Sequence, residues 1–183
     1  MNATLEMKAA GDEPRILVIQ PNRTYLGVMA RRLKEYGYRV ATAETASAGL
    51  AEMYRMPVNL VMCDVVLPGT NGIEFTRMVR EDPVNRDIPL LLVVGRSDPN
   101  AAVRAFQAGA DGVIRKPCHF EVLHACIERQ LARADAVKRL VTDNATLDAK
   151  VISRVIELKE VREQLTLAES ERRRLAAIVG QAA

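Results

Sequence analysis

The chain has 183 residues and a net charge of +3, enough for one domain of ordinary size plus an extension. Of its residues 49% are apolar and 4% are aromatic, with no Trp, a composition that suits an aliphatic α/β core. Because the net charge is small and no apolar run reaches the roughly 20 residues that span a bilayer, we expect neither a nucleic-acid nor a membrane partner.

Short apolar runs alternate with amphipathic helical patterns from residue 15 to about residue 115, and we expect the preceding residues 1–14 to be a disordered segment. The predicted strands, several of them uniformly apolar as in a sheet covered on both faces, are Ile16–Ile19, Arg39–Thr42, Leu60–Cys63, Leu90–Val94 and Gly112–Ile114. The predicted helices between them are Thr24–Tyr36, Ala46–Arg55, Ile73–Arg80 and Ala101–Ala108. Five β–α repeats imply right-handed crossovers and a doubly wound parallel sheet.

The C-terminal part of the chain differs in its sequence pattern. From Glu121 onward there is no proline, and the only glycine is Gly180, which predicts one long helix. We therefore divide the chain into a domain over residues 15–133 and a helical segment over residues 134–183. That helix, about 65 Å long over its apolar part, is too long to pack wholly on so small a domain.

A heptad repeat runs through this helix. With Val137 at position a, ten of the thirteen a and d positions are apolar, which predicts a coiled coil. Asn144 at an a position favours a parallel, two-stranded register, so we expect a homodimer. A helix folded back along its own domain is the alternative. The predicted dimer seam comprises Val137, Leu140, Asn144, Leu147, Val151, Leu158, Val161, Leu165 and Leu175.

The cysteines and histidines do not form a metal-ligand set. Cys63, Cys118 and Cys126 are odd in number, and His119 and His124 are five residues apart with no suitably spaced carboxylate. Residues 1–13 lack the apolar region of a signal peptide. We therefore expect reduced thiols in a cytoplasmic protein that holds no structural metal.

One carboxylate stands out. Asp64 follows the apolar run at 60–63, at the carboxyl end of a predicted strand, where open α/β sheets carry their chemistry. Further landmarks follow at regular intervals. They are Pro68-Gly69-x-Asn71-Gly72, Ile88-Pro89-Leu90, Gly109-Ala110-Asp111-Gly112 and Lys116-Pro117. With these landmarks in this order, the stretch Arg15–Leu131 resembles the receiver domain of two-component response regulators.

The resemblance implies a flavodoxin-like (βα)5 fold with strand order 2-1-3-4-5. It also implies that Asp64 accepts a phosphoryl group from a histidine kinase and that Lys116 ion-pairs with that group, its bond to Pro117 being usually cis. The chemistry explains these requirements: a carboxylate that attacks a phosphoryl donor needs Mg²⁺ to screen the converging negative charges, and a lysine to neutralise the product.

Four positions depart from the family pattern. Gln20 and Pro21 stand where the family has the acidic pair that holds Mg²⁺. Gln20 could offer only a neutral carbonyl oxygen, and Pro21 offers no side-chain ligand. Val94 replaces the switch hydroxyl, and Val113 replaces the aromatic residue whose rotation reports activation. Asn22 is better interpreted as the N-cap of the following helix than as a ligand.

These departures lead to two hypotheses, neither of them an enzyme. In the first, the chain is an atypical receiver that acts by protein–protein interaction and dimerisation without normal Mg²⁺-dependent phosphorylation, and Asp64 and Lys116 form a structural ion pair. In the second, a histidine kinase phosphorylates Asp64, with Mg²⁺ held only weakly there. Residues 167–179 resemble the signalling helix that precedes PAS domains and cyclic-di-nucleotide enzymes, so an output domain C-terminal to the coil is expected in that case.

Overall fold

The computed structural model describes residues 13–96 and 98–181, with side chains as far as Arg174 except that of Glu171. The chain forms two compact units, Met1–Asp135 and Ala136–Ala183, which we describe separately. The disordered segment expected over residues 1–14 falls almost wholly outside the described residues.

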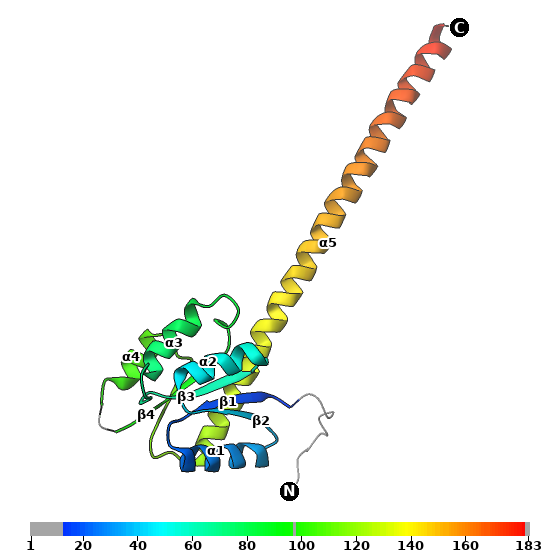
Figure 1. Ribbon diagram of the computed structural model, residues 1–183. Coiled ribbons are helices and arrows are strands. Elements are labelled where there is room, and N and C mark those ends of the chain that lie inside the picture. The colour runs from blue at the N-terminus through cyan, green and yellow to red at the C-terminus, as the bar shows by residue number, and fades with distance from the viewer. Residues whose placement is uncertain (1–12, 97, 182–183) are drawn as a thin grey trace. The chain divides into compact units, whose positions relative to one another are not determined.

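The first unit is built on a five-stranded parallel sheet in the order β2-β1-β3-β4-β5, which confirms the predicted fold class (Figure 1). Its strands are β1 (Arg15–Ile19), β2 (Arg39–Ala43), β3 (Leu60–Asp64), β4 (Leu90–Val94) and β5 (Gly112–Arg115). All residues of β3 and β4 are buried, as expected for central parallel strands covered on both faces.

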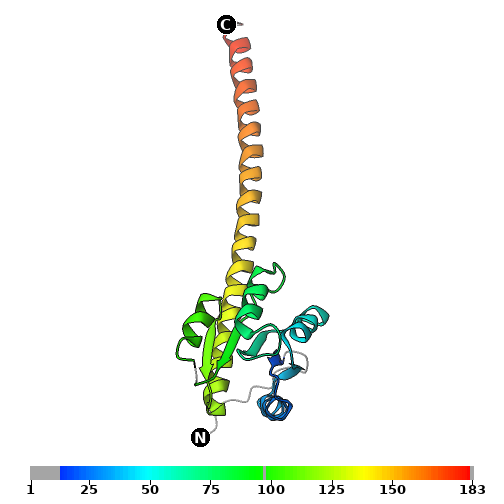
Figure 2. The ribbon, with the colours of Figure 1, turned by 60° about the vertical axis from the view of Figure 1, so that its left-hand side comes forward.

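Helices cover both faces of this sheet (Figures 1 and 2). One face packs against side chains of α2 (Ala46–Arg55), α3 (Gly72–Glu81) and α4 (Ala101–Gln107), with Phe75 fully buried at its centre. The other face packs against α1 (Arg23–Glu35) and the first turns of α5 (Phe120–Gln181), through Leu33, Leu123 and Ile127 among others. These two halves of the core hold the strands in place, so that their carboxyl ends line one edge of the sheet.

Local sequence features set the helix starts beside that edge. The Asn22 side chain accepts a hydrogen bond from the backbone nitrogen of Tyr25, which confirms it as the N-cap of α1. Asn71 caps α3 in a capping box with Glu74. Gly69, in the loop between β3 and α3, has a φ of 76°, a backbone conformation that favours glycine.

The second unit consists of the later turns of α5, and the predicted long C-terminal helix is confirmed. Its large apolar side chains from Val137 to Leu167 are each between 53% and 68% exposed. A monomer rarely leaves so much apolar surface uncovered over so great a length. None of the described helices combines the length and the apolar character required to cross a membrane.

Candidate functional site

The candidate site lies where four strands end at one edge of the sheet. Asp64 is the last residue of β3, Val94 is the last residue of β4, Gln20 follows β1 and Lys116 follows β5. Because carboxyl ends of parallel strands meet at the same edge, residues distant in sequence come together there. The structure thus gathers Asp64, Lys116 and Gln20 as the sequence predicts.

The Asp64 carboxylate is engaged by protein donors on both oxygens. Its Oδ2 accepts hydrogen bonds from Nε2 of Gln20 at 2.6 Å and from Nζ of Lys116, and its Oδ1 accepts one from the backbone nitrogen of Val66 at 3.0 Å. The Asp64 side chain is only 6% exposed, whereas that of Lys116 is 34% exposed. Asp64 is therefore a buried carboxylate with a partly solvated counterion.

Gln20 acts as a donor, in contrast to the expectation that it could offer a carbonyl oxygen to a metal. Its Nε2 faces Asp64, and its Oε1 accepts a hydrogen bond from the backbone nitrogen of Asn22 at 3.1 Å. The reason is physical: a carboxylate only accepts hydrogen bonds, so the amide presents its NH₂ group to it. Gln20 is itself 5% exposed, which leaves it few other partners.

Tyr25 belongs to this site and was missed from the sequence. Its ring lies 5.2 Å from the Lys116 ammonium, in the range of a cation–π contact. Burial raises the pKa of the Tyr25 hydroxyl, with smaller contributions from the charges of Cys118 and Asp64. The available signal was its place three residues after the predicted N-cap Asn22, on the first turn of α1 beside the strand edge.

The other residues that depart from the family pattern have apolar side chains. Val94 is 1% exposed and presents no hydroxyl toward the edge. Val113 is partly buried against the core, and Pro21 follows Gln20 without a side-chain donor or acceptor. The Lys116–Pro117 peptide bond is cis, as the resemblance implies.

This set of side chains does not match what Mg²⁺ requires. The ion needs near-octahedral oxygen ligands and is usually held by carboxylates. Among the described residues, no group of three or more His, Cys, Asp or Glu side chains is placed to hold a metal ion. Asp64 is the one carboxylate among the site residues, and the Oε1 of Gln20 already accepts a hydrogen bond.

The loop after β3 approaches helix α3 closely at Gly72. Its backbone nitrogen donates to the carbonyl of Val65 at 2.9 Å. A Cβ at Gly72 would meet the backbone oxygen of Asp64 and would lie 2.9 Å from Cα of Val65. Only glycine fits there, so this landmark holds the Asp64 loop against α3.

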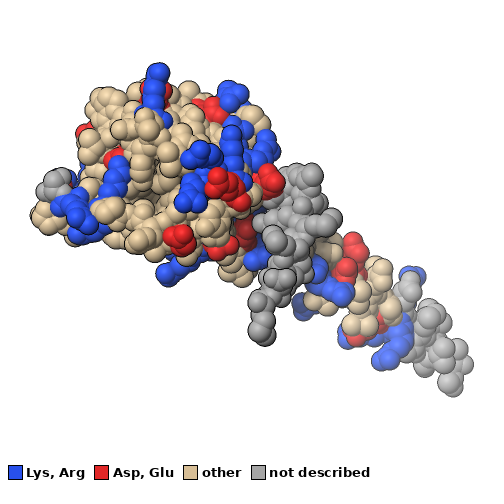
Figure 3. All heavy atoms as spheres, turned by 90° about the horizontal axis from the view of Figure 1, so that it is seen from below, with Lys and Arg blue, Asp and Glu red and all other residues tan. Residues whose placement is uncertain are grey.

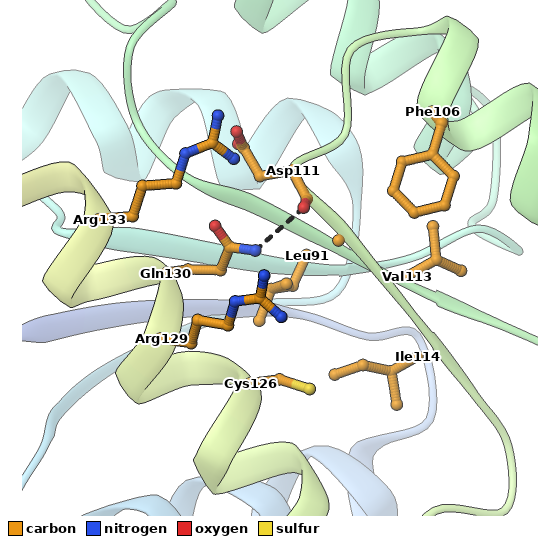
Figure 4. Close-up of a pocket in the computed structure, with 10 residues that line it drawn as sticks. Leu91, Phe106, Asp111, Val113, Ile114, Cys126, Arg129, Gln130 and Arg133 are labelled. Carbon is orange, nitrogen blue, oxygen red and sulfur yellow. Dashed lines mark hydrogen bonds between the residues drawn. The ribbon is translucent and has the colours of Figure 1, made fainter. Parts of the chain in front are cut away.

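A separate hollow of about 410 Å³ lies between β5 and α5 (Figure 4). Arg129, Gln130 and Arg133 of α5 line it, together with Asp111 and Phe106. Gln130 donates to the backbone oxygen of Asp111 at 2.9 Å, which ties α5 to the start of β5. On the face seen in Figure 3, acidic and basic side chains are mixed and separated by uncharged surface.

Comparisons with known proteins agree with this geometry. The family model for the response regulator receiver domain matches residues 16–128. Transcriptional regulatory protein AfsQ1 of Streptomyces coelicolor is 32% identical over 141 residues, which cover 77% of this chain and 60% of that protein. A probable cyclic di-GMP phosphodiesterase of Vibrio cholerae is 25% identical over 153 residues, which cover 84% of this chain and 34% of that protein.

Solved structures match about two thirds of this chain. A putative response regulator from Chloroflexus aurantiacus has a TM-score of 0.63 at 27% identity, covering 66% of this chain and 98% of that one. A CheY-like receiver domain protein from Methanospirillum hungatei has a TM-score of 0.63 at 27% identity, covering 68% of this chain and 98% of that one. The chain spans between about a third and three fifths of the length of the two curated relatives.

Proposed function

Because the chain belongs to the response regulator receiver domain family, we propose that it is an atypical receiver module of two-component signalling. It acts by protein–protein interaction and dimerisation, without normal Mg²⁺-dependent phosphorylation of Asp64. One observation carries the proposal: Gln20, Lys116 and the backbone nitrogen of Val66 already bind the Asp64 carboxylate.

The charge balance at the site supports this proposal. A phosphoryl donor is anionic, so its approach to a carboxylate is repelled unless a divalent cation screens the two. Among the described residues, Lys116 is the ion-pair partner of Asp64, and its single charge offsets the single charge of Asp64. With Gln20 and Pro21 in place of two carboxylates, the attraction for a hard divalent cation is much reduced.

The test is exposure of the full chain to Mg²⁺ and acetyl phosphate, followed by intact-mass measurement. We expect no added phosphoryl group and no saturable Mg²⁺ binding by calorimetry. The matched variant restores the missing carboxylates, Gln20→Asp with Pro21→Asp, and should gain Mg²⁺ affinity. A phosphoryl adduct on the wild-type chain that disappears in Asp64→Asn would contradict the proposal.

The contact between Lys116 and Asp64 favours a second candidate function. A lysine in this place is what an acyl phosphate on Asp64 would need for neutralisation. In this alternative a histidine kinase phosphorylates Asp64, and the chain feeds an output domain C-terminal to the coil. The same mass measurement, repeated with a kinase as donor, decides between the two candidates.

Dimerisation is proposed from the exposed seam of α5. Seven of its apolar members are between 53% and 68% exposed within the second unit; they are Val137, Leu140, Leu147, Val151, Leu158, Val161 and Leu165. The side chain of Leu175, predicted as a further member, lies outside the described residues. A parallel two-stranded coil with Asn144 at an a position would cover this seam.

Sedimentation equilibrium of the full chain tests the coil. Leu158→Asp with Leu165→Asp should abolish the parallel pairing, while the thermal unfolding of the first unit should not change. Asn144→Leu should strengthen the association of the coil, and it should allow coils with other numbers of strands to form. A dimer that survives the two aspartate substitutions would contradict the proposed seam.

We propose that the chain itself is not an enzyme and that it works in the cytoplasm. The phosphodiesterase named among its relatives is covered by this chain over only 34% of its length. The three cysteines are free thiols in the structure, which is the state expected in a reducing compartment.

A further inference from the structure

The hollow between β5 and α5 shares no lining residue with the Asp64 site. Its volume is about 410 Å³, and it lies wholly within the first unit. Its floor is aliphatic, because Leu91 of β4 is 1% exposed and Ile114 of β5 is 4% exposed. Small-molecule sites have volumes of roughly 300–1,000 Å³. The hollow is at the lower end of this range, so it suits a ligand of one ring system and one charged group.

Two arginines of α5 line one wall of this hollow. Arg129 and Arg133 are four residues apart, so their side chains lie on the same side of the helix. Within the described parts of the chain, neither guanidinium is within ion-pair distance of a carboxylate. Like charges at this spacing destabilise a helix. An anion bound between the two arginines would replace this repulsion with attraction.

The positive charge of this wall is not cancelled by Asp111, the acidic residue that lines the hollow. The Oδ2 of Asp111 accepts hydrogen bonds from Nη2 of Arg80 at 2.6 Å and from the backbone nitrogen of Leu90 at 2.9 Å. Arg80 therefore balances Asp111, and Arg129 and Arg133 remain as two uncompensated positive charges. A phosphate monoester has a charge of about −1.5 to −2 at pH 7, and its oxygens match the fork of a guanidinium.

An aromatic ring lies on the opposite side of the hollow. Figure 4 shows Phe106 of α4 across from the α5 wall, and its side chain is 55% exposed. An exposed phenylalanine ring is a surface on which another flat ring can stack. The hollow thus combines a cationic wall with an aromatic one.

The floor between these walls is kept open by a glycine. A Cβ at Gly112 would lie 2.6 Å from Cδ2 of Leu91 and 3.4 Å from Nε2 of Gln130, so a larger residue would fill this space. Gln130 itself donates from Nε2 to the backbone oxygen of Asp111. Its Oε1 accepts no hydrogen bond from the described residues, so it is available to a hydroxyl or amino group of a ligand.

We propose that the hollow binds a nucleoside monophosphate, a flat aromatic base joined through a sugar to a dianionic phosphate. The phosphate lies between Arg129 and Arg133, and the base stacks on Phe106. A simple anion would leave Phe106 uncovered, and an uncharged ring would leave both guanidiniums unpaired. The proposal goes beyond the atypical receiver and does not depend on it, because no residue that lines the hollow belongs to the Asp64 site or to the seam.

Calorimetric titration of the full chain with adenosine 5′-monophosphate tests the binding, at about 50 mM salt so that charge interactions are little screened. We expect saturable binding with a Kd below about 1 mM. Inorganic phosphate and adenosine each represent one half of the ligand, and each should bind at least about tenfold more weakly. The nucleotide should also raise the melting temperature of the chain, since a ligand that binds only the folded state stabilises it.

Two variants test the two walls separately. Arg129→Gln with Arg133→Gln should raise the Kd at least about tenfold, because charge-assisted hydrogen bonds are lost. Phe106→Ala should raise it about three- to tenfold, because the stacking partner is removed. Both arginines are exposed, and their mutual repulsion is removed in the double variant. The unligated double variant should therefore melt at the same temperature as the wild type or slightly higher.

The matched control is Arg31→Gln with Lys34→Gln. These exposed residues lie on α1, which packs beside β1 and β2, whereas the hollow lies beside β5 at the other end of the sheet. The control removes the same charge and should leave the Kd unchanged.

Four results would overturn the proposal. The first is the absence of saturable nucleotide binding up to about 10 mM. The second is inorganic phosphate or adenosine that binds as tightly as the nucleotide, which would remove the need for one of the two walls. The third is an equal loss of affinity in the control, which would indicate attraction to the charge of the whole chain. The fourth is benzoate that binds more tightly than the nucleotide, which would assign the hollow to an aromatic carboxylate.

Discussion

Removal of Lys116 is the sharpest test of the ion pair with Asp64. In Lys116→Met, the buried carboxylate keeps only two neutral donors, Nε2 of Gln20 at 2.6 Å and the backbone nitrogen of Val66 at 3.0 Å. Breaking a fully buried pair costs about 3–5 kcal/mol. Since a third of the Lys116 side chain is exposed to solvent, we expect a smaller loss of unfolding free energy, about 2 kcal/mol.

The opposite substitution should cost less. Asp64→Asn keeps an oxygen that accepts hydrogen bonds, and the freed ammonium of Lys116 can turn to water, so we expect a loss of about 1 kcal/mol or less. The double variant leaves no unpaired charge and should cost less than the sum of the single changes, with a coupling of about 1–2 kcal/mol. Denaturant titration at pH 7 and a fixed chain concentration measures all four proteins.

Arg115→Met is the matched control for this cycle, because Arg115 is the exposed neighbour of Lys116 on the same strand end. It should change the unfolding free energy by less than about 0.5 kcal/mol. Strict additivity of the Asp64 and Lys116 changes would refute the structural ion pair. So would a Lys116→Met variant as stable as the control.

Two further predictions concern the first unit. Gly72→Ala should lower the unfolding free energy by about 1–3 kcal/mol, because the added methyl group meets the Asp64–Val65 backbone. Gly27 lies in α1 with open space around it, so Gly27→Ala should raise the unfolding free energy by about 0.5–1 kcal/mol. The pKa of Tyr38 is raised from 10.0 to about 12 by burial, so the folded state holds its proton longer than the unfolded state. Its contribution is therefore present below pH 10 and lost as the pH rises toward 12, and Tyr38→Phe should flatten the fall in melting temperature over that range.

The sequence predicted the elements of the first unit well, because their boundaries follow from local chemistry. α2 and β4 match their predicted ranges, and most other ends differ by one residue. The third strand was predicted to end at Cys63 but continues to Asp64, which still pairs with Val93 of β4. The hydrophobic pattern marks only the apolar run, whereas the pairing between β3 and β4 continues to the first polar residue, Asp64.

The sequence placed Asp64, Lys116 and Gln20 at this edge, but it predicted neither their hydrogen bonds nor the contact with Tyr25. Strand ends of a parallel sheet share an edge, so Asp64 and Lys116 had to meet once the strand order was known. The orientation of the Gln20 amide depends on which groups lack partners in the folded chain, and no local pattern encodes that. The ring of Tyr25 reaches Lys116 through tertiary packing of α1, and spacing predicts only that Tyr25 lies on the first turn of that helix.

The two halves of the chain point to the same kind of regulation. On the proposal that Asp64 is not phosphorylated, a phosphoryl-driven change of the surface plays no part in this chain. What remains variable is assembly, and assembly responds to chain concentration by mass action. On this reasoning Asp64→Asn should leave assembly unchanged, whereas substitutions in the seam should alter it without disturbing the fold of the first unit.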